Sequence, residues 1–227
     1  MSWRIRVPAT SANLGPGFDC LALALDLWNE VDLSVETGED CLQIQIEGEG
    51  QSYLPRDESN AVYRGMQDYA HRHGKPLPGG IKLLCRNRIP VSSGLGSSAA
   101  AAVAGILCAA ALLNLPEDRQ DQLACAAELE GHGDNSAACL LGGLTAFLRD
   151  GNQIYARQLP VVPLCLVVVT PDFHFSTRQA RNVLPQQVAF KNAVKNLSRS
   201  ILLIEALRTG DLELLRAASC DQLHQPY

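Results

Sequence analysis

The stretch VSSGLGSSAAAAVAG, residues 91–105, mixes three glycines and four serines with alanine and carries no charge. Glycine permits backbone angles that a Cβ forbids, so Gly94 and Gly96 let the chain approach a ligand closely. Alanine is the strongest helix former, and we expect a helix from Ser97 or Ser98 onwards. The unpaired N–H groups at its start would face the loop, which favours an anion such as phosphate. The serine hydroxyls add groups for phosphate oxygens or a magnesium ion.

Two standard nucleotide-binding patterns test this interpretation. The Walker pattern GxxxxGK[ST] is absent, since no lysine follows the loop. GLGSSA, residues 94–99, fits the dinucleotide fingerprint, but that motif needs a strand running directly into its first glycine. Here RNRIPVSS, residues 86–93, intervenes, and a second helix follows the first. Dinucleotide binding, and a small-residue turn that only packs a helix, remain as alternatives.

Hydrophobic periodicity places strands before and after a helical middle, which predicts the α+β class. Strands are expected within residues 4–10 (ending at Pro8), 21–37, 41–50, 79–91, 142–148 and 163–170. Helices are expected within residues 60–74, 97–114, 115–135 (with Pro116 in the first turn) and 190–210. The last helix carries one apolar stripe: Phe190, Val194, Leu197, Ile201 and Ile204. A domain boundary is predicted near Leu159–Pro163.

Composition excludes several classes of partner. Net charge is −5 over 227 residues, and the lysines and arginines are scattered, which argues against nucleic acid and anionic membrane surfaces. The N-terminus lacks the apolar core of a signal peptide, and the longest apolar run, residues 161–169, is too short to span a bilayer. The eight cysteines form no CxxC pair, and most lie in apolar stretches. Free thiols in a reducing cytoplasm are therefore expected.

Two further segments gather polar side chains. PATSANLGPGFD, residues 8–19, places Asn13 and Asp19 beside a glycine-rich backbone, a good lining for a polar, cationic small molecule. A plain turn is the alternative for this segment. ELEGHGDN clusters five groups that could hold a metal or position a proton: Glu128, Glu130, His132, Asp134 and Asn135. A solvated helix end is the alternative, and the spacing is not that of a zinc site.

Taken together, these segments resemble the GHMP kinase superfamily. PVSSGLGSSAAAA, residues 90–102, is similar to its phosphate-binding motif P-x-x-x-G-L-G-S-S-A-A. Within the superfamily, residues 7–25, 130–135 and 176–185 are most similar to the homoserine kinase family, and the resemblance runs over nearly the whole chain. It implies an N-terminal ribosomal-protein-S5-domain-2-like α+β domain over residues 1–160. An incomplete ferredoxin-like α+β domain would follow over residues 161–227.

The resemblance implies transfer of the γ-phosphoryl group of ATP to the side-chain hydroxyl of L-homoserine, in threonine biosynthesis, with Mg²⁺ as cofactor. The triphosphate would lie in the loop made by Pro90, Val91, Ser92, Ser93, Gly94, Leu95, Gly96, Ser97, Ser98, Ala99 and Ala100. Ser98 matches the magnesium-ligating serine of the superfamily. Glu128 or Glu130 would be its metal-ligating glutamate. Glu128 is preferred, because it would lie one further turn back from the turn formed by residues 132–135.

For the amino-acid substrate, the resemblance implies that Asn13 and Asp19 hold the ammonium and hydroxyl end. His132 and Asn135 would complete that pocket, and Arg181 would hold the carboxylate through a bidentate contact. Several GHMP kinases use an aspartate base in this region, whereas homoserine kinases have asparagine, which takes no proton. Asp134 is a candidate base, and transfer by proximity with late loss of the proton is the alternative.

The sequence also departs from the family pattern. The family usually has EGHPDNV, where this chain has Gly133 and Ser136, and glycine should loosen the backbone that aims Asn135. The family continues beyond LHQPY with an arginine, a glycine-rich third motif and further strands, so a fragment of low activity with partly uncovered helices is expected. Another small-molecule GHMP kinase and a non-catalytic nucleotide-binding relic are the alternative functions, and a homodimer is left open.

Overall fold

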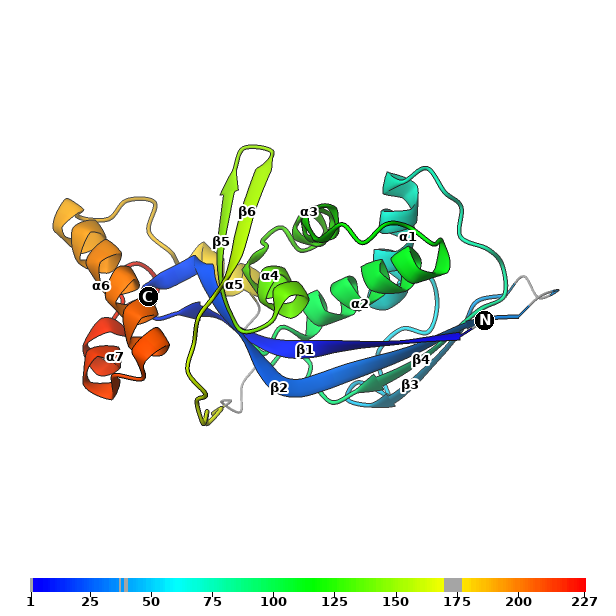
Figure 1. Cartoon of the computed structure of the whole chain (residues 1–227), viewed down its shortest axis with the longest axis horizontal. Coiled ribbons are helices and arrows are strands. Elements are labelled where there is room, and N and C mark those ends of the chain that lie inside the picture. The colour runs from blue at the N-terminus through cyan, green and yellow to red at the C-terminus, as the bar shows by residue number, and fades with distance from the viewer. Residues whose placement is uncertain (1, 37, 39–40, 170–176) are drawn as a thin grey trace.

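The computed structural model describes residues 2–36, 38, 41–169 and 177–227. Strand β2 (Gly17–Val35) lies at the centre of its sheet, and β1 (Ser2–Leu14) runs antiparallel along one edge of it. The other edge of β2 pairs with β4 (Ile81–Asn87) and then with β5 (Leu144–Asp150). β3 (Gln43–Gly48) joins β4 in parallel, and β6 (Gln153–Leu159) joins β5 antiparallel. The sheet therefore extends in two directions from one long strand (Figure 1).

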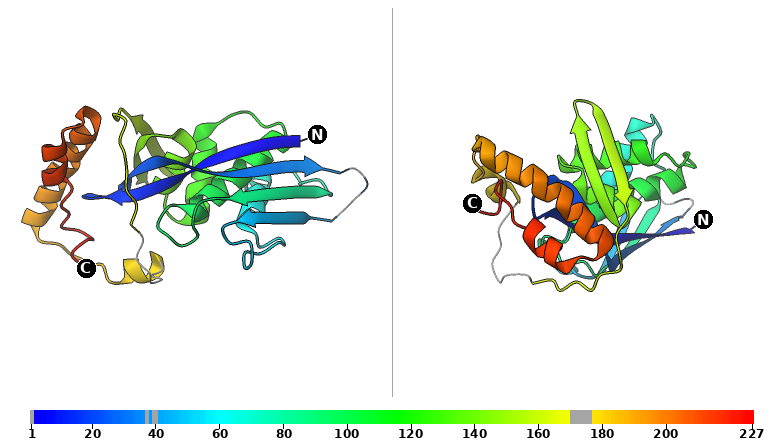
Figure 2. Two further views of the ribbon diagram at one scale, coloured as in Figure 1. Left: turned by 90° about the horizontal axis from the view of Figure 1, so that it is seen from below. Right: turned by 60° about the vertical axis from the view of Figure 1, so that its left-hand side comes forward.

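Four helices cover one face of the sheet, as Figure 1 shows: α1 (Ala61–Arg72), α2 (Ser97–Leu112), α3 (Arg119–Glu130) and α4 (Asp134–Leu141). A short helix α5 (Thr177–Asn182) precedes α6 (Phe190–Thr209) and α7 (Leu212–Ala218). Figure 2 shows α6 and α7 side by side at the end of the sheet that is far from the N-terminus. The structure thus combines a mixed sheet with helices, which confirms the predicted α+β class.

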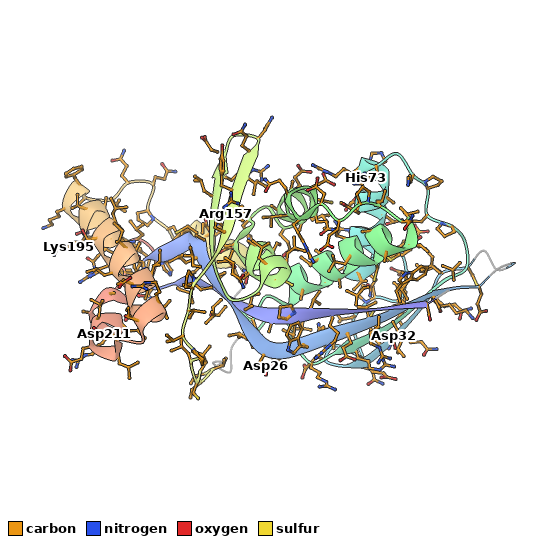
Figure 3. The ribbon with its side chains drawn as sticks, in the orientation of Figure 1. Asp26, Asp32, His73, Arg157, Lys195 and Asp211 are labelled. Atoms are coloured by element: carbon orange, nitrogen blue, oxygen red, sulfur yellow. The ribbon has the colours of Figure 1, made fainter. Side chains whose placement is uncertain are left out.

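Alternation along β2 explains which face is buried. Val31 and Leu33 are almost inaccessible and pack beneath the helices, whereas Asp32 lies on the opposite face of the strand. Asp32, labelled in Figure 3, accepts hydrogen bonds from Arg4 and Arg86. The hydrogen bond from Arg4 has the largest effect, and together these contacts lower the pKa of the Asp32 carboxyl to about 2. A period of two therefore separates an apolar core from a charged outer face.

Side chains cap the starts of two of the four helices that cover the sheet. Asn60 accepts from the backbone N–H of Val62 and caps α1, and Asp118 accepts from two N–H groups and caps α3. The prediction that Pro116 lies in the first turn of α3 is wrong, because the helix begins at Arg119, directly after its N-cap Asp118. The sequence also predicted a continuous helix up to Asn135, whereas Gly131 ends α3 in a left-handed conformation and a separate helix, α4, follows.

Two strand predictions need correction. β1 does not end at Pro8 but continues to Leu14, because a register shift between Pro8 and Ala9 accommodates the missing N–H in an edge strand. Residues 160–169 form no regular secondary structure, although PLCLVVVT was predicted as a strand; Thr170 lies outside the described residues. Val167 is 90 % exposed. Apolar, β-branched residues alone do not make a strand where no neighbouring strand accepts their hydrogen bonds.

Helix α6 is present as predicted, but of the predicted stripe only Ile204 packs against the apolar cluster that the described residues form with the sheet. Phe190, Leu197 and Ile201 are 84, 66 and 63 % exposed. The face that packs on the sheet carries Leu203 and Leu207, which join Leu21, Leu23, Leu144 and Ala218 in a second apolar cluster. This cluster ties α6 and α7 to β2 and β5. The predicted domain boundary follows the end of β6 at Leu159 and stays a prediction.

No helix among the described residues is both long and apolar enough to cross a membrane.

The close crossing of α1 and α2 generates a stability prediction. A Cβ built on Gly105 would lie 2.0 Å from the carbonyl oxygen of Val62 and 3.0 Å from the Cα of Gly65. Helix propensity alone predicts that Gly105→Ala stabilises the protein by about 1 kcal/mol. We expect the opposite sign, a loss of about 1–3 kcal/mol in the free energy of unfolding, because backbone atoms cannot move aside. Urea unfolding measures this, and a stabilised variant would contradict the close packing.

Candidate active site

The loop between β4 and α2 has the geometry of an anion-binding site. Ser92, Gly94 and Gly96 have φ angles of 58°, 77° and 67°, in the left-handed region. Gly96 is the N-cap of α2, and no side chain of the described residues caps this helix. Its first N–H groups therefore remain open toward the loop, where the helix dipole adds partial positive charge.

The two loop glycines are required for different reasons. A Cβ on Gly94 would meet nothing within 4 Å, so only its backbone angle and the open space for a ligand constrain it. A Cβ on Gly96 would lie 2.1 Å from Thr10 Oγ1 and 3.0 Å from Asn135 Oδ1. The expectation that Gly96 only allows a close approach to a ligand is therefore incomplete. Gly96 also lets the loop pack directly onto β1 and α4.

A cavity of about 530 Å³ lies in front of this loop, a volume typical of small-molecule sites. Many predicted residues line it: Asn13, Val91, Ser92, Ser93, Gly94, Gly96, Ser97, Ser98, Ala99, Glu130, His132, Asp134, Asn135 and Arg181. Four predicted loop or metal residues do not: Pro90, Leu95, Ala100 and Glu128. Leu95 and Ala100 are buried in the core instead. The fold thus gathers polar segments that lie far apart in the sequence.

The two candidate metal-ligating glutamates have different neighbours. The hydroxyl of Ser98 donates to Glu130 Oε1 over 2.8 Å, and both residues line the cavity. Glu128 accepts from Arg72 on α1 over 3.0 Å. The geometry therefore favours Glu130, not the preferred Glu128, as the candidate beside Ser98. Residues two positions apart point about 200° apart around a helix, so only one of the pair faces the loop.

His132, Asp134 and Asn135 form one hydrogen-bonded group at the start of α4. His132 Nδ1 lies 3.2 Å from Asp134 Oδ1, which also accepts from the backbone N–H of Asn135. Asp134 is 2 % exposed. Its hydrogen bond raises the pKa of His132 above the usual value, against the opposing effect of burial. Asp134 therefore holds the imidazole and the helix start in place.

Thr10 is a site residue that sequence reasoning missed. Its hydroxyl donates to Asn135 Oδ1 over 2.7 Å, and its backbone N–H donates to the carbonyl oxygen of Leu95 over 3.0 Å. Nothing in the local pattern distinguished Thr10 from any other polar residue of the first segment. Its importance arises from contacts with residues more than 80 positions away.

Asp19 and Arg181 were predicted to hold opposite ends of a substrate, and here they pair with each other. The Arg181 guanidinium donates to both oxygens of Asp19, over 2.9 and 2.6 Å. This hydrogen bond raises the pKa of Arg181. Arg181 also lies over the Phe18 ring, 5.4 Å from its centroid. Asn13 accepts from the N–H of Asp19 over 2.8 Å and so closes the turn that carries the carboxylate.

The departure at Gly133 has a structural reason. A Cβ at this position would lie 2.2 Å from the Phe147 ring, and the φ angle of −122° is far from the value that proline requires. Gly133 therefore packs against Phe147, where the family pattern has proline. Because the ring restrains this backbone, the expectation that glycine loosens the turn is not supported by the packing.

Another set of cavity residues was not predicted as part of the site: Leu54, Pro55, Asn60, Val62 and Asn87. Sequence reasoning had used some of them only as strand or helix residues. A polar residue at a helix cap, such as Asn60, gives no signal that distinguishes a site from a cap.

Comparison with known proteins identifies the class of protein to which this fold belongs. The model of the GHMP kinases N terminal domain matches residues 60–143. A phosphomevalonate kinase from Streptococcus pneumoniae is similar in structure, with a TM-score of 0.68 over 96 % of this chain and 77 % of that chain. At 13 % identity this likeness shows the fold alone. The fold is that of the GHMP kinases.

Closer similarity narrows the family. A homoserine kinase from Moorella thermoacetica is 45 % identical over 98 % of this chain and 74 % of its own length. A second homoserine kinase, from Streptomyces coelicolor, is also 45 % identical, and this chain covers 72 % of its length. The crystal structure of homoserine kinase from Cytophaga hutchinsonii matches with a TM-score of 0.81 at 31 % identity, over 99 % of this chain and 73 % of that chain. The chain belongs to the homoserine kinase family and spans about three quarters of the length of these relatives.

The pair formed by His132 and Asp134 predicts a pH dependence. Because the folded pKa of His132 is raised, the stability contributed by its charge is fully present below the unfolded pKa of about 6.5 and is lost as the pH rises through the folded value. We expect the NMR titration midpoint of His132 to lie above about 6.5 in the parent and to fall in Asp134→Asn. An equal or higher midpoint in that variant would assign the raised pKa to another group.

Proposed function

We propose that this protein transfers the γ-phosphoryl group of ATP to the side-chain hydroxyl of L-homoserine, giving O-phospho-L-homoserine and ADP. One observation carries the proposal: an uncapped helix start in a glycine–serine loop opens into the same cavity as Arg181 and Asn13, with Asp19 paired to Arg181. Homoserine kinase relatives of 41–45 % identity support the choice of acceptor.

The loop would bind the triphosphate of ATP through backbone groups. The open N–H groups of α2 and the left-handed backbone at Gly94 offer donors without side-chain bulk. The hydroxyls of Ser92, Ser97 and Ser98 border the same space. In a loose phosphoryl-transfer transition state, positioning and neutralisation of charge outweigh covalent chemistry, and this loop supplies both.

Mg²⁺ fits the donors that the structure brings together. Ser98 and Glu130 offer one hydroxyl and one carboxylate oxygen at the mouth of the loop. Magnesium prefers oxygen ligands and is commonly bound by one or two carboxylates together with substrate phosphates. When bound there, the ion would neutralise charge on the phosphate oxygens.

The Asp19–Arg181 ion pair matches the charges of a zwitterion. An amino acid brings an ammonium for Asp19 and a carboxylate for Arg181, so one internal pair would be exchanged for two pairs with the substrate. Both side chains are near 40 % exposed, which leaves them accessible to a ligand. The planar guanidinium suits bidentate recognition of a carboxylate. His132 and Asn135 would border the hydroxyl end.

Neither of the described residues Asn135 and Asp134 is suited to take the proton of the acceptor hydroxyl. Asn135 takes no proton, and Asp134 is buried and already bonded to His132 and to the backbone. We therefore favour transfer by proximity, with the proton leaving late, over catalysis by Asp134. A loose transition state keeps most of the proton on the attacking oxygen until late, so a base contributes little.

The product would serve threonine biosynthesis, and we place the protein in the cytoplasm. Seven cysteines are free thiols, as expected for a reducing compartment: Cys20, Cys85, Cys108, Cys125, Cys139, Cys165 and Cys220. A homodimer stays a proposal without structural support.

The function is tested by incubating the protein with ATP, Mg²⁺ and L-homoserine. ADP release should depend on the amino acid, and ³¹P NMR should show a new phosphomonoester. Homoserine lactone, which lacks both the free hydroxyl and the free carboxylate, is the control acceptor. ADP release at the same rate without an acceptor would contradict the proposal, as would mevalonate acting better than homoserine.

The two glutamates of α3 provide a matched pair of variants. Glu130→Gln removes the carboxylate beside Ser98, and we expect the Mg²⁺ concentration for half-maximal ADP release to rise by at least about tenfold. Glu128→Gln removes the same charge from the same helix but only loses the ion pair with Arg72. It should leave the magnesium dependence unchanged and alter stability by less than about 1 kcal/mol. The reverse order of effects would restore Glu128 as the ligand.

Arg181→Ala should raise the KM for homoserine much more than the KM for ATP. The carboxylate contact is made in the ground state and the transition state alike, so its loss falls mainly on binding, with a change of roughly 10- to 100-fold. Arg208→Ala, which removes an exposed arginine paired with Glu205 on α6, is the control and should change neither KM. Equal effects of Arg181→Ala on both substrates would count against its role.

A further inference from the structure

Thr10 joins three segments of the site from a fully buried position. It lies in the middle of β1, opposite Ala24, and has 0 % exposure. Its backbone N–H donates to the carbonyl oxygen of Leu95 in the phosphate loop, over 3.0 Å. Its hydroxyl donates to Asn135 Oδ1 at the start of α4, over 2.7 Å. A single residue, through its backbone N–H and its hydroxyl, thus contacts both the loop side and the acceptor side of the cavity.

The hydroxyl of Thr10 determines which end of the Asn135 amide faces the cavity. An asparagine side chain offers an accepting oxygen and a donating NH₂ group of nearly the same shape, so only its partners fix the orientation. A threonine hydroxyl has one proton to donate, and here it points to Oδ1. With the oxygen held in this way, the NH₂ group is the end left for a ligand in the cavity that Asn135 lines.

Gly96 keeps this hydroxyl in place. A Cβ at Gly96 would lie 2.1 Å from Thr10 Oγ1, so the hydroxyl occupies the space where any other residue would carry its side chain. Movement of Thr10 into the loop is therefore blocked by the backbone of Gly96. The orientation of Asn135 and the position of the phosphate loop are set by one packed contact.

We propose that Thr10 is a positioning residue, which acts through Asn135 to present an N–H donor to the oxygens of the reacting groups. This inference rests on the proposed kinase function. Negative charge on the acceptor and phosphoryl oxygens is stabilised by a preorganised donor and opposed by an oxygen in the same place. The favoured amide orientation therefore matters for turnover more than for the binding of either substrate.

Thr10→Val replaces the hydroxyl by a methyl group of similar shape. We expect kcat to fall by roughly 10- to 100-fold, because the amide loses the partner that fixes it. The KM for ATP should change by less than about threefold, since the backbone bond to Leu95 is kept. Thr10→Ser retains the hydroxyl and should keep kcat within about threefold of the parent.

A matched control separates this role from a loss of stability. Thr145 is also almost fully buried, at 1 % exposure, and its hydroxyl donates to the carbonyl oxygen of Gly142 outside the cavity. Thr145→Val should lower the thermal midpoint about as much as Thr10→Val and leave kcat unchanged. If both variants reduce kcat in proportion to their loss of stability, Thr10 has only a structural role.

A double-mutant cycle tests the path through Asn135. In an Asn135→Ala background, Thr10→Val should cause no further loss of kcat, because the group that it orients is gone. If Thr10→Val lowers kcat by the same factor with and without Asn135, the two residues act independently and the proposal fails.

An NMR measurement keeps this inference separate from the proposed function. Absence of homoserine phosphorylation by the parent would overturn the kinase assignment but not the orientation of the amide. The side-chain ¹⁵N–¹H₂ resonances of Asn135, assigned by their loss in Asn135→Ala, should shift in Thr10→Val and stay in place in Thr145→Val. Unchanged resonances in Thr10→Val would overturn the role of Thr10 whether or not the protein turns over homoserine.

Discussion

The close contact between the glycine–serine loop and the middle of β1 is the constraint on which the site depends. Gly96 has no room for a side chain because Thr10 and Asn135 fill that space. The same contact holds the start of α2, so its unpaired N–H groups face the cavity rather than a neighbouring residue. Once this packing is formed, the glycine–serine loop, residues 8–19 and α4 border one cavity, and each has a fixed position relative to the others.

Several polar groups in and beside the cavity have a partner before a ligand arrives. Asp19 is paired with Arg181, Ser98 with Glu130 and His132 with Asp134. These internal contacts keep the polar lining ordered and avoid uncompensated charge. The Asp19–Arg181 pair differs from the His132–Asp134 pair because both of its charged side chains remain near 40 % exposed, whereas Asp134 is buried. It is therefore the pair that a zwitterionic ligand would most easily replace, whereas Asp134 is too buried to be exchanged.

The sequence by itself determined the features that depend on local interactions. The Ala-rich helix after the loop, the Asn60 cap of α1 and the alternation of β2 follow from propensity, capping and a period of two. The family was also recognisable from the sequence, because backbone chemistry at the loop restricts which residues are allowed there. Many of the residues that line the cavity could be named from the sequence, since they lie within a few continuous motifs.

Only the tertiary structure decided the features that depend on distant partners. The choice of Glu130 over Glu128 depends on which face of α3 meets the loop, and Arg72 of α1 takes the other residue. Thr10 gains its role from Leu95 and Asn135, which are far away along the chain. The exposed stripe of α6 and the coil at residues 160–169 show that an apolar pattern does not fix what it packs against. Local patterns specify which groups a segment offers, whereas packing between segments specifies which of those groups meet.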